Sequence, residues 1–126
     1  MNIPGNLKYT KDHEWLKIEG KIGIIGITDY AQGELGDIVY MDINPDVTEI
    51  TEGQSFGTIE AVKTVSDMYA PVSGKVLELN KKLNDEPQLV NTDPYGEGWI
   101  VKIEITDPSQ VANLMDAAAY QSQLGQ

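Results

Sequence analysis

The stretch from Ser55 to Ala70 constrains the fold more than any other part of the sequence. It contains no glycine after Gly57 and no proline, so its composition marks no break. Fully extended it would span roughly 53 Å at ~3.3 Å per residue, whereas a domain of this length is roughly 35 Å across. Its many β-branched residues favour strands over a helix. We therefore predict a β-hairpin with its tip at Val62 and Lys63.

This hairpin is inferred from length and not from turn chemistry. The tip sequence Ala-Val-Lys-Thr contains neither Asn-Gly nor Asp-Gly, the dipeptides typical of tight hairpins. A reversal at the tip places Phe56 opposite Tyr69, which is a favourable aromatic cross-strand pair. The same register puts Glu60 and Asp67 on the hairpin face that carries Phe56.

The rest of the chain indicates a mostly β fold with small helices. Alternating apolar and polar residues predict strands over 13–19, 21–27, 37–43, 47–50, 75–79 and 99–105, with 87–90 extended. Thr28 is expected to cap a short helix that ends between Gly33 and Gly36. One helical turn is expected within 80–86, and Pro108 marks the start of a C-terminal helix. The 126 residues fit a single domain, with a core over about 6–105 and a C-terminal helical segment over about 107–121.

Composition removes several classes of function. The absence of cysteine excludes disulfides, thiolate metal sites and a cysteine nucleophile, and a single histidine argues against a multi-histidine metal site. The net charge of −11 disfavours nucleic acid and anionic membrane surfaces. No apolar run approaches the ~20 residues that a membrane span needs. The N-terminal sequence lacks a signal or transit pattern, so we expect a bacterial cytoplasmic protein, with a mature mitochondrial matrix form as the alternative.

Lys63 stands out among the charged residues. It is the only cation between Lys21 and Lys75, a stretch that holds nine carboxylates. Composition alone favours a solvated surface lysine. The alternative is a covalent attachment point, because a hairpin tip presents the ε-amine away from the body of the protein, and acylation would turn it into a neutral amide.

A family resemblance bears on this choice. The segment from Phe56 to Asp67 resembles the lipoyl-attachment segment of the glycine cleavage system H protein family, and Pro71–Val76 is similar to the strand that follows it there. Further similar motifs are Lys8-Tyr9, His13-Glu14-Trp15, Gly26-Ile27-Thr28-Asp29-Tyr30-Ala31-Gln32, Leu35-Gly36-Asp37-Ile38-Val39 and Pro94-Tyr95-Gly96-Glu97-Gly98-Trp99. Five such motifs in the same order make the resemblance specific, and it spans roughly Asn6 to Tyr120.

The resemblance implies a lipoyl/biotinyl-like flattened barrel of two antiparallel sheets, with small helices and a C-terminal helix. It implies lipoate in amide linkage to Lys63 and a carrier without catalytic residues of its own. The implied partners are a pyridoxal-phosphate glycine decarboxylase, a tetrahydrofolate-dependent aminomethyltransferase, dihydrolipoamide dehydrogenase with FAD and NAD, and a lipoate-attaching enzyme. The carrier would move an aminomethyl group and electrons between them. We expect a monomer.

Three further carboxylates are candidate site residues. Glu60 and Asp67 would be read by the lipoate-attaching enzyme or contact the loaded arm; the alternative is solvated charge on a strand. The resemblance implies that Glu14 lies near the cleft of the arm, where it would pair with an amine. His13 beside it is interpreted as a structural hydrogen-bonding residue, and Asp12 and Glu34 are weaker candidates for the same cleft.

Other functions remain open at this stage. A lipoyl-bearing relay protein that donates lipoate to other proteins would share the attachment chemistry. A biotin carrier is less favoured, because that family brackets its lysine with methionines and here the neighbours are Val62 and Thr64. An enzyme with Lys63 as a Schiff-base nucleophile needs a neutral amine in an apolar or cationic pocket, whereas carboxylates dominate this part of the sequence. An unmodified interaction domain is the fourth possibility.

Overall fold

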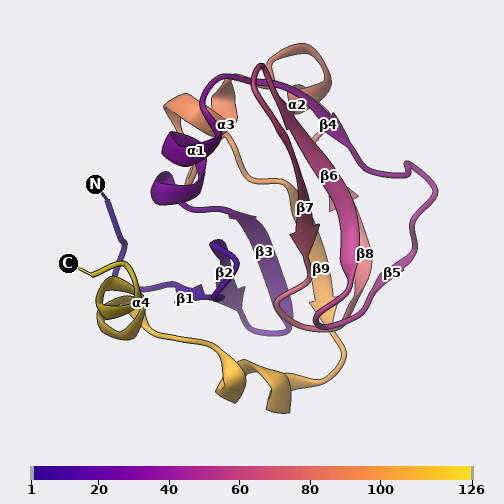
Figure 1. Cartoon of the computed structure of the whole chain (residues 1–126). Helices are drawn as coiled ribbons and strands as arrows, with labels where there is room; N and C mark the ends of the chain where they lie inside the picture. The colour runs from indigo at the N-terminus through magenta and orange to yellow at the C-terminus, as the bar shows by residue number, and fades with distance from the viewer. Residues whose placement is uncertain (1, 126) are drawn as a thin grey trace.

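Two antiparallel β-sheets form the framework of the protein (Figure 1). The structure is a computed structural model and describes residues 2–125. One sheet has six strands in the order β1 (Lys8–Tyr9), β2 (Glu14–Glu19), β3 (Ile22–Ile27), β9 (Val101–Ile105), β8 (Gly74–Leu79) and β5 (Glu49–Ile50). The other has three strands in the order β4 (Ile38–Asp42), β6 (Ser55–Ala61) and β7 (Val65–Tyr69). The predicted mostly β class is confirmed.

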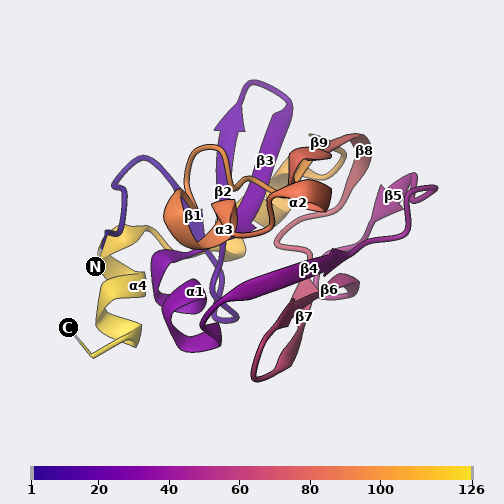
Figure 2. The same ribbon diagram turned by 90° about the horizontal axis from the view of Figure 1, so that it is seen from above.

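The main hydrophobic core lies between the two sheets, which form separate layers in the view from above (Figure 2). Side chains alternate across a strand, so each sheet turns one set of apolar residues toward the other. The six-stranded sheet contributes Leu16, Ile25, Ile27, Val101 and Ile103, and the three-stranded sheet contributes Ile38, Met41, Ile59, Ala61 and Met68. This arrangement is the flattened barrel-sandwich that was expected.

The hairpin prediction is correct at the tip and wrong in its register at the base. Ser55, and not Phe56, pairs with Tyr69, and Gly57 pairs with Met68, so Phe56 forms a β-bulge. The cause is the close approach of Gly57 to the end of β4, where a Cβ atom would lie 2.8 Å from the Asp42 carbonyl oxygen. The bulge turns the partly buried Phe56 ring against the core instead of pairing it with Tyr69.

Three short helices lie in the connections between strands: α1 follows β3, and α2 and α3 both lie between β8 and β9. Helix α1 (Asp29–Leu35) begins as predicted at Thr28, whose Oγ1 accepts a hydrogen bond from the Ala31 N–H, and it ends at Gly36 with a φ of 79°. Helix α2 (Lys82–Asp85) agrees with the turn expected within 80–86. Helix α3 (Leu89–Thr92) contradicts the extended conformation expected for 87–90. The fully buried Val90 anchors α3, a tertiary contact that the local sequence does not indicate.

The C-terminal segment divides into two short helices. A 3₁₀ helix (Pro108–Asn113) begins where Pro108 predicted, and α4 (Ala117–Gln123) begins after Asp116, whose side chain accepts from the Ala119 N–H. The Tyr120 ring of α4 is fully buried and stacks on Tyr9 with 4.7 Å between ring centroids. Together with Leu7 and Trp15 these rings form a second cluster, here named the terminal cluster.

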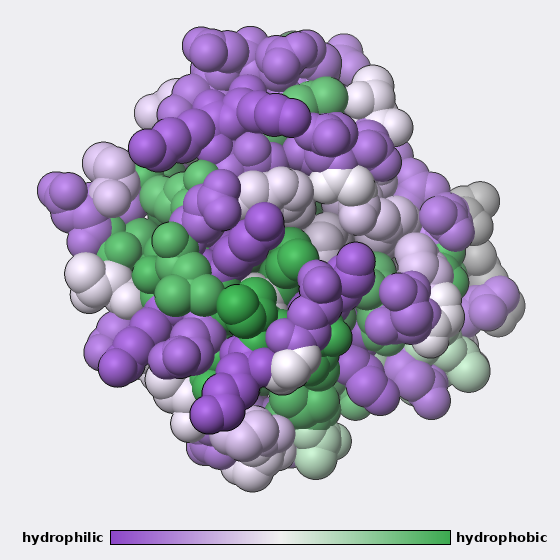
Figure 3. All heavy atoms as spheres, turned by 180° about the vertical axis from the view of Figure 1, so that it is seen from behind, coloured by the Kyte–Doolittle hydropathy of each residue, from purple (hydrophilic) through white to green (hydrophobic). Residues whose placement is uncertain are grey.

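The outer face of the six-stranded sheet is mixed in character. Seen from behind in Figure 3, this side is largely hydrophilic with separate apolar patches. The exposed apolar side chains of its strands are Ile18, Ile22 and Leu77. Within residues 2–125, no helix has the length and apolar character required to span a bilayer.

Candidate functional site

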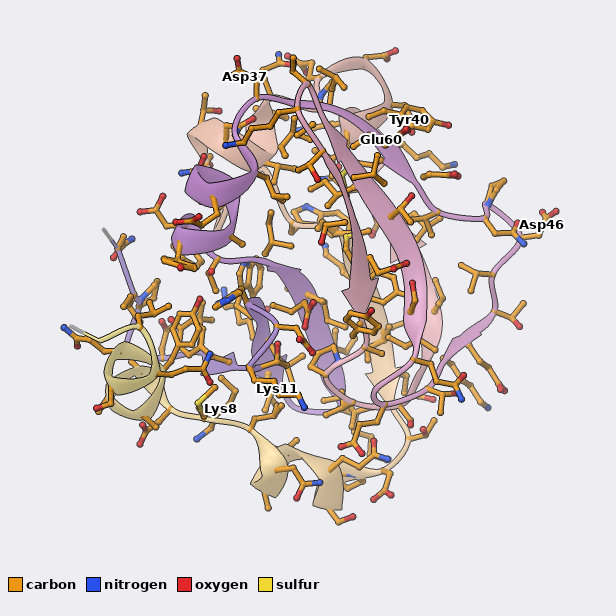
Figure 4. The ribbon with its side chains drawn as sticks, viewed as in Figure 1. Lys8, Lys11, Asp37, Tyr40, Asp46 and Glu60 are labelled. Carbon is orange, nitrogen blue, oxygen red and sulfur yellow. The ribbon has the colours of Figure 1, made fainter. Side chains whose placement is uncertain are left out.

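The hairpin reverses at Val62 and Lys63, as its length predicted. The Ala61 N–H donates to the Thr64 carbonyl at 2.8 Å across the tip, and the Val62 N–H donates to the Asp37 carbonyl at 3.0 Å. Asp37 belongs to the segment between α1 and β4 and lies beside the tip in Figure 4. A backbone bond from a neighbouring segment therefore supports a turn whose own sequence lacks a turn signal.

Lys63 is exposed at this tip. Within residues 2–125 no carboxylate comes within ion-pairing distance of its amine; the pairs found there join Lys82 to Glu97 and Lys102 to Glu78. The aliphatic part of the side chain lies across Gly36, where a Cβ atom would be 3.4 Å from Lys63 Cε. The amine is thus accessible to solvent while its stem rests on the backbone of a neighbouring loop.

Apolar side chains surround the tip and are unusually exposed. Val62 is 75% exposed, Val65 59%, Val39 51% and Tyr40 49%. These four residues are the majority of the seven large apolar side chains classed as exposed in residues 2–125. Grouped apolar exposure next to an accessible amine is typical of a surface that another protein covers.

Glu60 and Asp67 lie together on the outer face of the three-stranded sheet. Asp67 pairs with Thr58, two residues before Glu60, so both carboxylates point to the same face. The expectation that Phe56 shares this face is wrong, because the bulge turns its ring against the core. Glu60 is also opposite Tyr40 of β4, and these two side chains lie near each other in Figure 4. Asp67 accepts a hydrogen bond from Ser55 Oγ at 3.0 Å. The hairpin thus presents two carboxylates on the strands that lead to and from Lys63.

The structure places Glu14 apart from these residues, at the opposite end of β7 from Lys63. Its side chain is only 2% exposed. The Thr10 hydroxyl donates to Oε1 at 2.6 Å, and the Tyr69 N–H donates to Oε2 at 3.2 Å. Glu14 lines an open cleft of about 330 Å³, together with residues that include Thr10, Asp12, Tyr69, Asn113 and Met115. No local sequence pattern predicts the contributions of Thr10, Tyr69 and Asn113 to this cleft.

Burial is the main influence on the protonation of Glu14. It raises the pKa of this carboxyl to about 7, despite the hydrogen bonds from Thr10 and Tyr69 that favour the charged form. Near neutral pH the cleft therefore holds a carboxyl group that gains or loses its proton easily. A cationic group placed against it would favour the ionised form.

His13 has the structural role that was expected. Its Nδ1 lies 2.8 Å from the Tyr120 hydroxyl, which in turn lies 2.7 Å from Thr28 Oγ1, so it joins α4 to the start of α1. Burial lowers the pKa of His13, and the nearby charges of Asp12 and Glu34 oppose this shift. Asp12 lines the cleft and Glu34 is not among its lining residues.

Two further features of the structure bear on other kinds of chemistry. Within residues 2–125 no group of three or more histidine and carboxylate side chains is placed to hold a metal ion. A second open cavity, of about 460 Å³, lies between β4 and β8 and is lined mainly by apolar side chains such as Met41, Val47 and Leu83. It contains neither Lys63 nor Glu14.

Comparisons with known proteins agree on one family. A family profile described as "Glycine cleavage H-protein" matches residues 7–126. A glycine cleavage system H protein of Chlorobium phaeovibrioides is 56% identical over 127 residues, with 99% of both chains covered. The H protein of Staphylococcus saprophyticus is 54% identical, with 100% of both chains covered. That of Symbiobacterium thermophilum is also 54% identical, and the match covers 94% of this chain and 93% of the relative.

The fold comparison gives the same answer. The crystal structure of a glycine cleavage system H protein from Mycobacterium marinum superposes with a TM-score of 0.89. It is 40% identical in sequence and covers 98% of this chain and 100% of its own.

Proposed function

Because the chain belongs to the glycine cleavage H-protein family, we propose that it carries lipoate in amide linkage on Lys63. It then acts as a carrier and co-substrate of the glycine cleavage system, without catalytic residues of its own. The similar chains come from bacteria, which supports a bacterial cytoplasm as the setting.

The residues at the hairpin tip fit an acylated lysine. Lys63 is exposed and has no ion-pair partner within residues 2–125, so acylation breaks no salt bridge. The tip is held by backbone bonds through Ala61 and Val62, which do not involve the amine. Loss of the lysine charge therefore leaves the supporting contacts intact, and the exposed apolar neighbours suit an apolar arm.

The bound lipoyl group supplies what a cysteine-free chain lacks, a pair of sulfur atoms that can carry an aminomethyl group and then two electrons. We propose that the aminomethyl group comes from the pyridoxal-phosphate glycine decarboxylase and passes to the tetrahydrofolate-dependent aminomethyltransferase. The electrons pass to dihydrolipoamide dehydrogenase. Lys63 tethers the cargo, which keeps it at a high effective concentration for each partner.

The lipoate-attaching enzyme recognises Lys63 in part through the carboxylates of Glu60 and Asp67. Both carboxylates lie on the outer face of the hairpin that ends in Lys63. Charge on the rim of an interface mainly sets the rate and the specificity of docking. An attaching enzyme with cationic side chains around its active site would be steered to this hairpin.

Glu14 provides a docking place for a cationic amine at the other end of β7. Its carboxyl lines a cleft, is held by Thr10 and Tyr69, and has a pKa raised to about 7. A primary ammonium entering the cleft would stabilise the carboxylate form and release a proton.

The single observation that carries the proposal is the exposed Lys63 amine, which has no ion-pair partner among residues 2–125, at the hairpin tip of a chain in this family. The test is intact mass and peptide mapping of protein from lipoate-supplied cells. We expect a lipoyl mass increment on the peptide that contains Lys63. A preparation that stays unmodified when an active lipoate-attaching enzyme is present would contradict the proposal.

A further inference from the structure

The amide side chain of Asn91, outside the hairpin, joins three groups near the hairpin tip. Asn91 lies on α3, and its Oδ1 accepts from the Ile38 N–H at 2.9 Å. Its Nδ2 donates to the Gly36 carbonyl at 2.9 Å and to Gln32 Oε1 at 3.0 Å. One side chain therefore holds both ends of the short segment 36–38 and the last turn of α1.

The segment 36–38 is also what the tip rests on. Its middle carbonyl, that of Asp37, accepts from the Val62 N–H at 3.0 Å. Its first residue, Gly36, lies under the Lys63 stem, with 3.4 Å between a Cβ atom built at Gly36 and Lys63 Cε. A continuous set of contacts thus runs from Asn91 through the segment 36–38 to the residue before Lys63 and to Lys63 itself.

The sheet alone supports the tip weakly. The last pair between β4 and β6 is Ile38 with Ala61, and the register of this ladder shifts between Ile38 and Tyr40. Within the hairpin the last strand pair is Glu60 with Val65, so Val62 and Lys63 have no strand partner of their own. Unsupported hairpin tips open locally at low free-energy cost. A tip that is already held loses less conformational entropy when an enzyme binds it. Contacts that hold the segment 36–38 therefore affect how well Lys63 is presented.

We propose that Asn91 is a positioning residue for lipoyl attachment: it fixes the segment 36–38 against which Val62 and Lys63 are held. This inference rests on the proposed modification of Lys63 and adds to it a residue 28 positions away in the sequence. An asparagine suits the role because its amide offers two donors and an acceptor in one fixed plane. An aspartate at this position keeps the acceptor and loses both donors.

The test uses the full chain with Asn91→Ala and Asn91→Asp, and Asn84→Ala as the matched control. Asn84 is an exposed asparagine on α2, and within residues 2–125 its side chain makes no hydrogen bond. Two readouts are needed: hydrogen–deuterium exchange of the unmodified protein at the Val62 amide, and kcat/KM for lipoylation of Lys63 by a purified attaching enzyme.

For Asn91→Ala we expect the Val62 amide to exchange roughly tenfold faster, the size expected when a supporting hydrogen bond is lost. The kcat/KM for lipoylation should fall by a similar factor, while exchange at Trp15 in the terminal cluster stays unchanged. Asn91→Asp keeps the acceptor for the Ile38 N–H but sets a carboxylate oxygen against the Gly36 carbonyl. It should show a change of the same kind, and it preserves the test if the alanine variant does not fold. The control should match the parent protein in both readouts.

Three results would overturn the inference. They are unchanged exchange at Val62, unchanged lipoylation, or an equal acceleration of exchange at Val62 and Trp15, which would indicate a general structural role. Failure of the parent protein to become lipoylated would instead remove the proposed function, and the exchange at Val62 would still decide whether Asn91 holds the tip.

Discussion

The two ends of strand β7 place a charged side chain in opposite environments, one exposed and one buried. At the tip Lys63 is exposed, and the bonds that support it come from the backbone of Val62 and Asp37. At the base Glu14 is 2% exposed, and each of its carboxyl oxygens accepts a hydrogen bond. The tip therefore exposes a group that can be modified without affecting stability, whereas the base buries a group whose protonation is coupled to folding.

The largest expected effect is on function at the tip. Lys63→Arg keeps the charge but cannot take an amide-linked lipoyl group, so we expect complete loss of lipoylation and of activity in a reconstituted glycine cleavage assay. Because the side chain is exposed, stability should change by less than about 0.5 kcal/mol. Lys75→Arg, at another exposed lysine on β8, is the control and should retain activity. Retained activity in Lys63→Arg would contradict the proposed attachment.

The next effect concerns stability at the base. The pKa of Glu14 is raised from 4.5 to about 7 in the folded protein, so the folded state binds the extra proton. Ionising the buried Glu14 carboxyl lowers the free energy of unfolding. This loss of stability is absent below pH 4.5, grows as the pH rises toward 7, and reaches about 3 kcal/mol above pH 7. Glu14→Gln mimics the protonated carboxyl and should remove this loss.

Urea denaturation at two pH values checks this prediction. At pH 8 the Glu14→Gln variant should be more stable than the parent protein by up to about 3 kcal/mol, and below pH 4.5 the two should be equal. A difference that is the same at both pH values would show that Glu14 is not the buried proton-binding group.

A smaller effect is expected at the outer face of the hairpin. Glu60→Ala should slow lipoylation roughly two- to tenfold, because a rim charge acts mainly on the rate of docking. Its melting temperature should stay close to that of the parent protein. Glu49→Ala on β5, an exposed carboxylate far along the chain from Lys63, is the matched control. Unchanged lipoylation kinetics would remove Glu60 from the site.

The smallest effect should come from the most exposed apolar residue at the tip. Val62 is 75% exposed, so Val62→Ala should change the free energy of unfolding by less than about 0.5 kcal/mol. Met68 on the same hairpin is 1% exposed, and Met68→Ala should cost about 2–5 kcal/mol through the cavity that it leaves. Equal losses in chemical denaturation would mean that the tip is packed in solution.

The sequence predicts the hairpin tip because the extended length of residues 55–70 exceeds the diameter of the domain. The chain must therefore reverse, whatever residues stand at the tip. It does not predict the register at the base, since the bulge at Phe56 depends on the approach of Gly57 to β4. The helix α3 was missed for a similar reason. Its four residues are too few to show a helical period, and the burial of Val90 stabilises it only in the folded chain.

The residues of the candidate site also fall into those that the sequence indicates and those that only the fold brings together. Lys63 is conspicuous as an isolated cation among carboxylates, and the family resemblance then implies that it carries the lipoyl group. Glu14 lies on an alternating strand, where alternation alone gives no reason to bury a carboxylate. Its burial comes from Tyr69 and from the C-terminal segment that closes the cleft. Asn91 stands in a stretch typical of a loop, and only the folded chain brings it to the segment 36–38.

The position of the two tryptophans determines what fluorescence can report. Trp15 belongs to the terminal cluster and Trp99 packs against it, whereas the three-stranded sheet contains no tryptophan. Tryptophan emission, excited selectively, will therefore follow the loosening of the chain ends and will not change when the lysine-bearing hairpin opens. Melting curves recorded by fluorescence and by backbone circular dichroism should separate in any variant that frees this hairpin first.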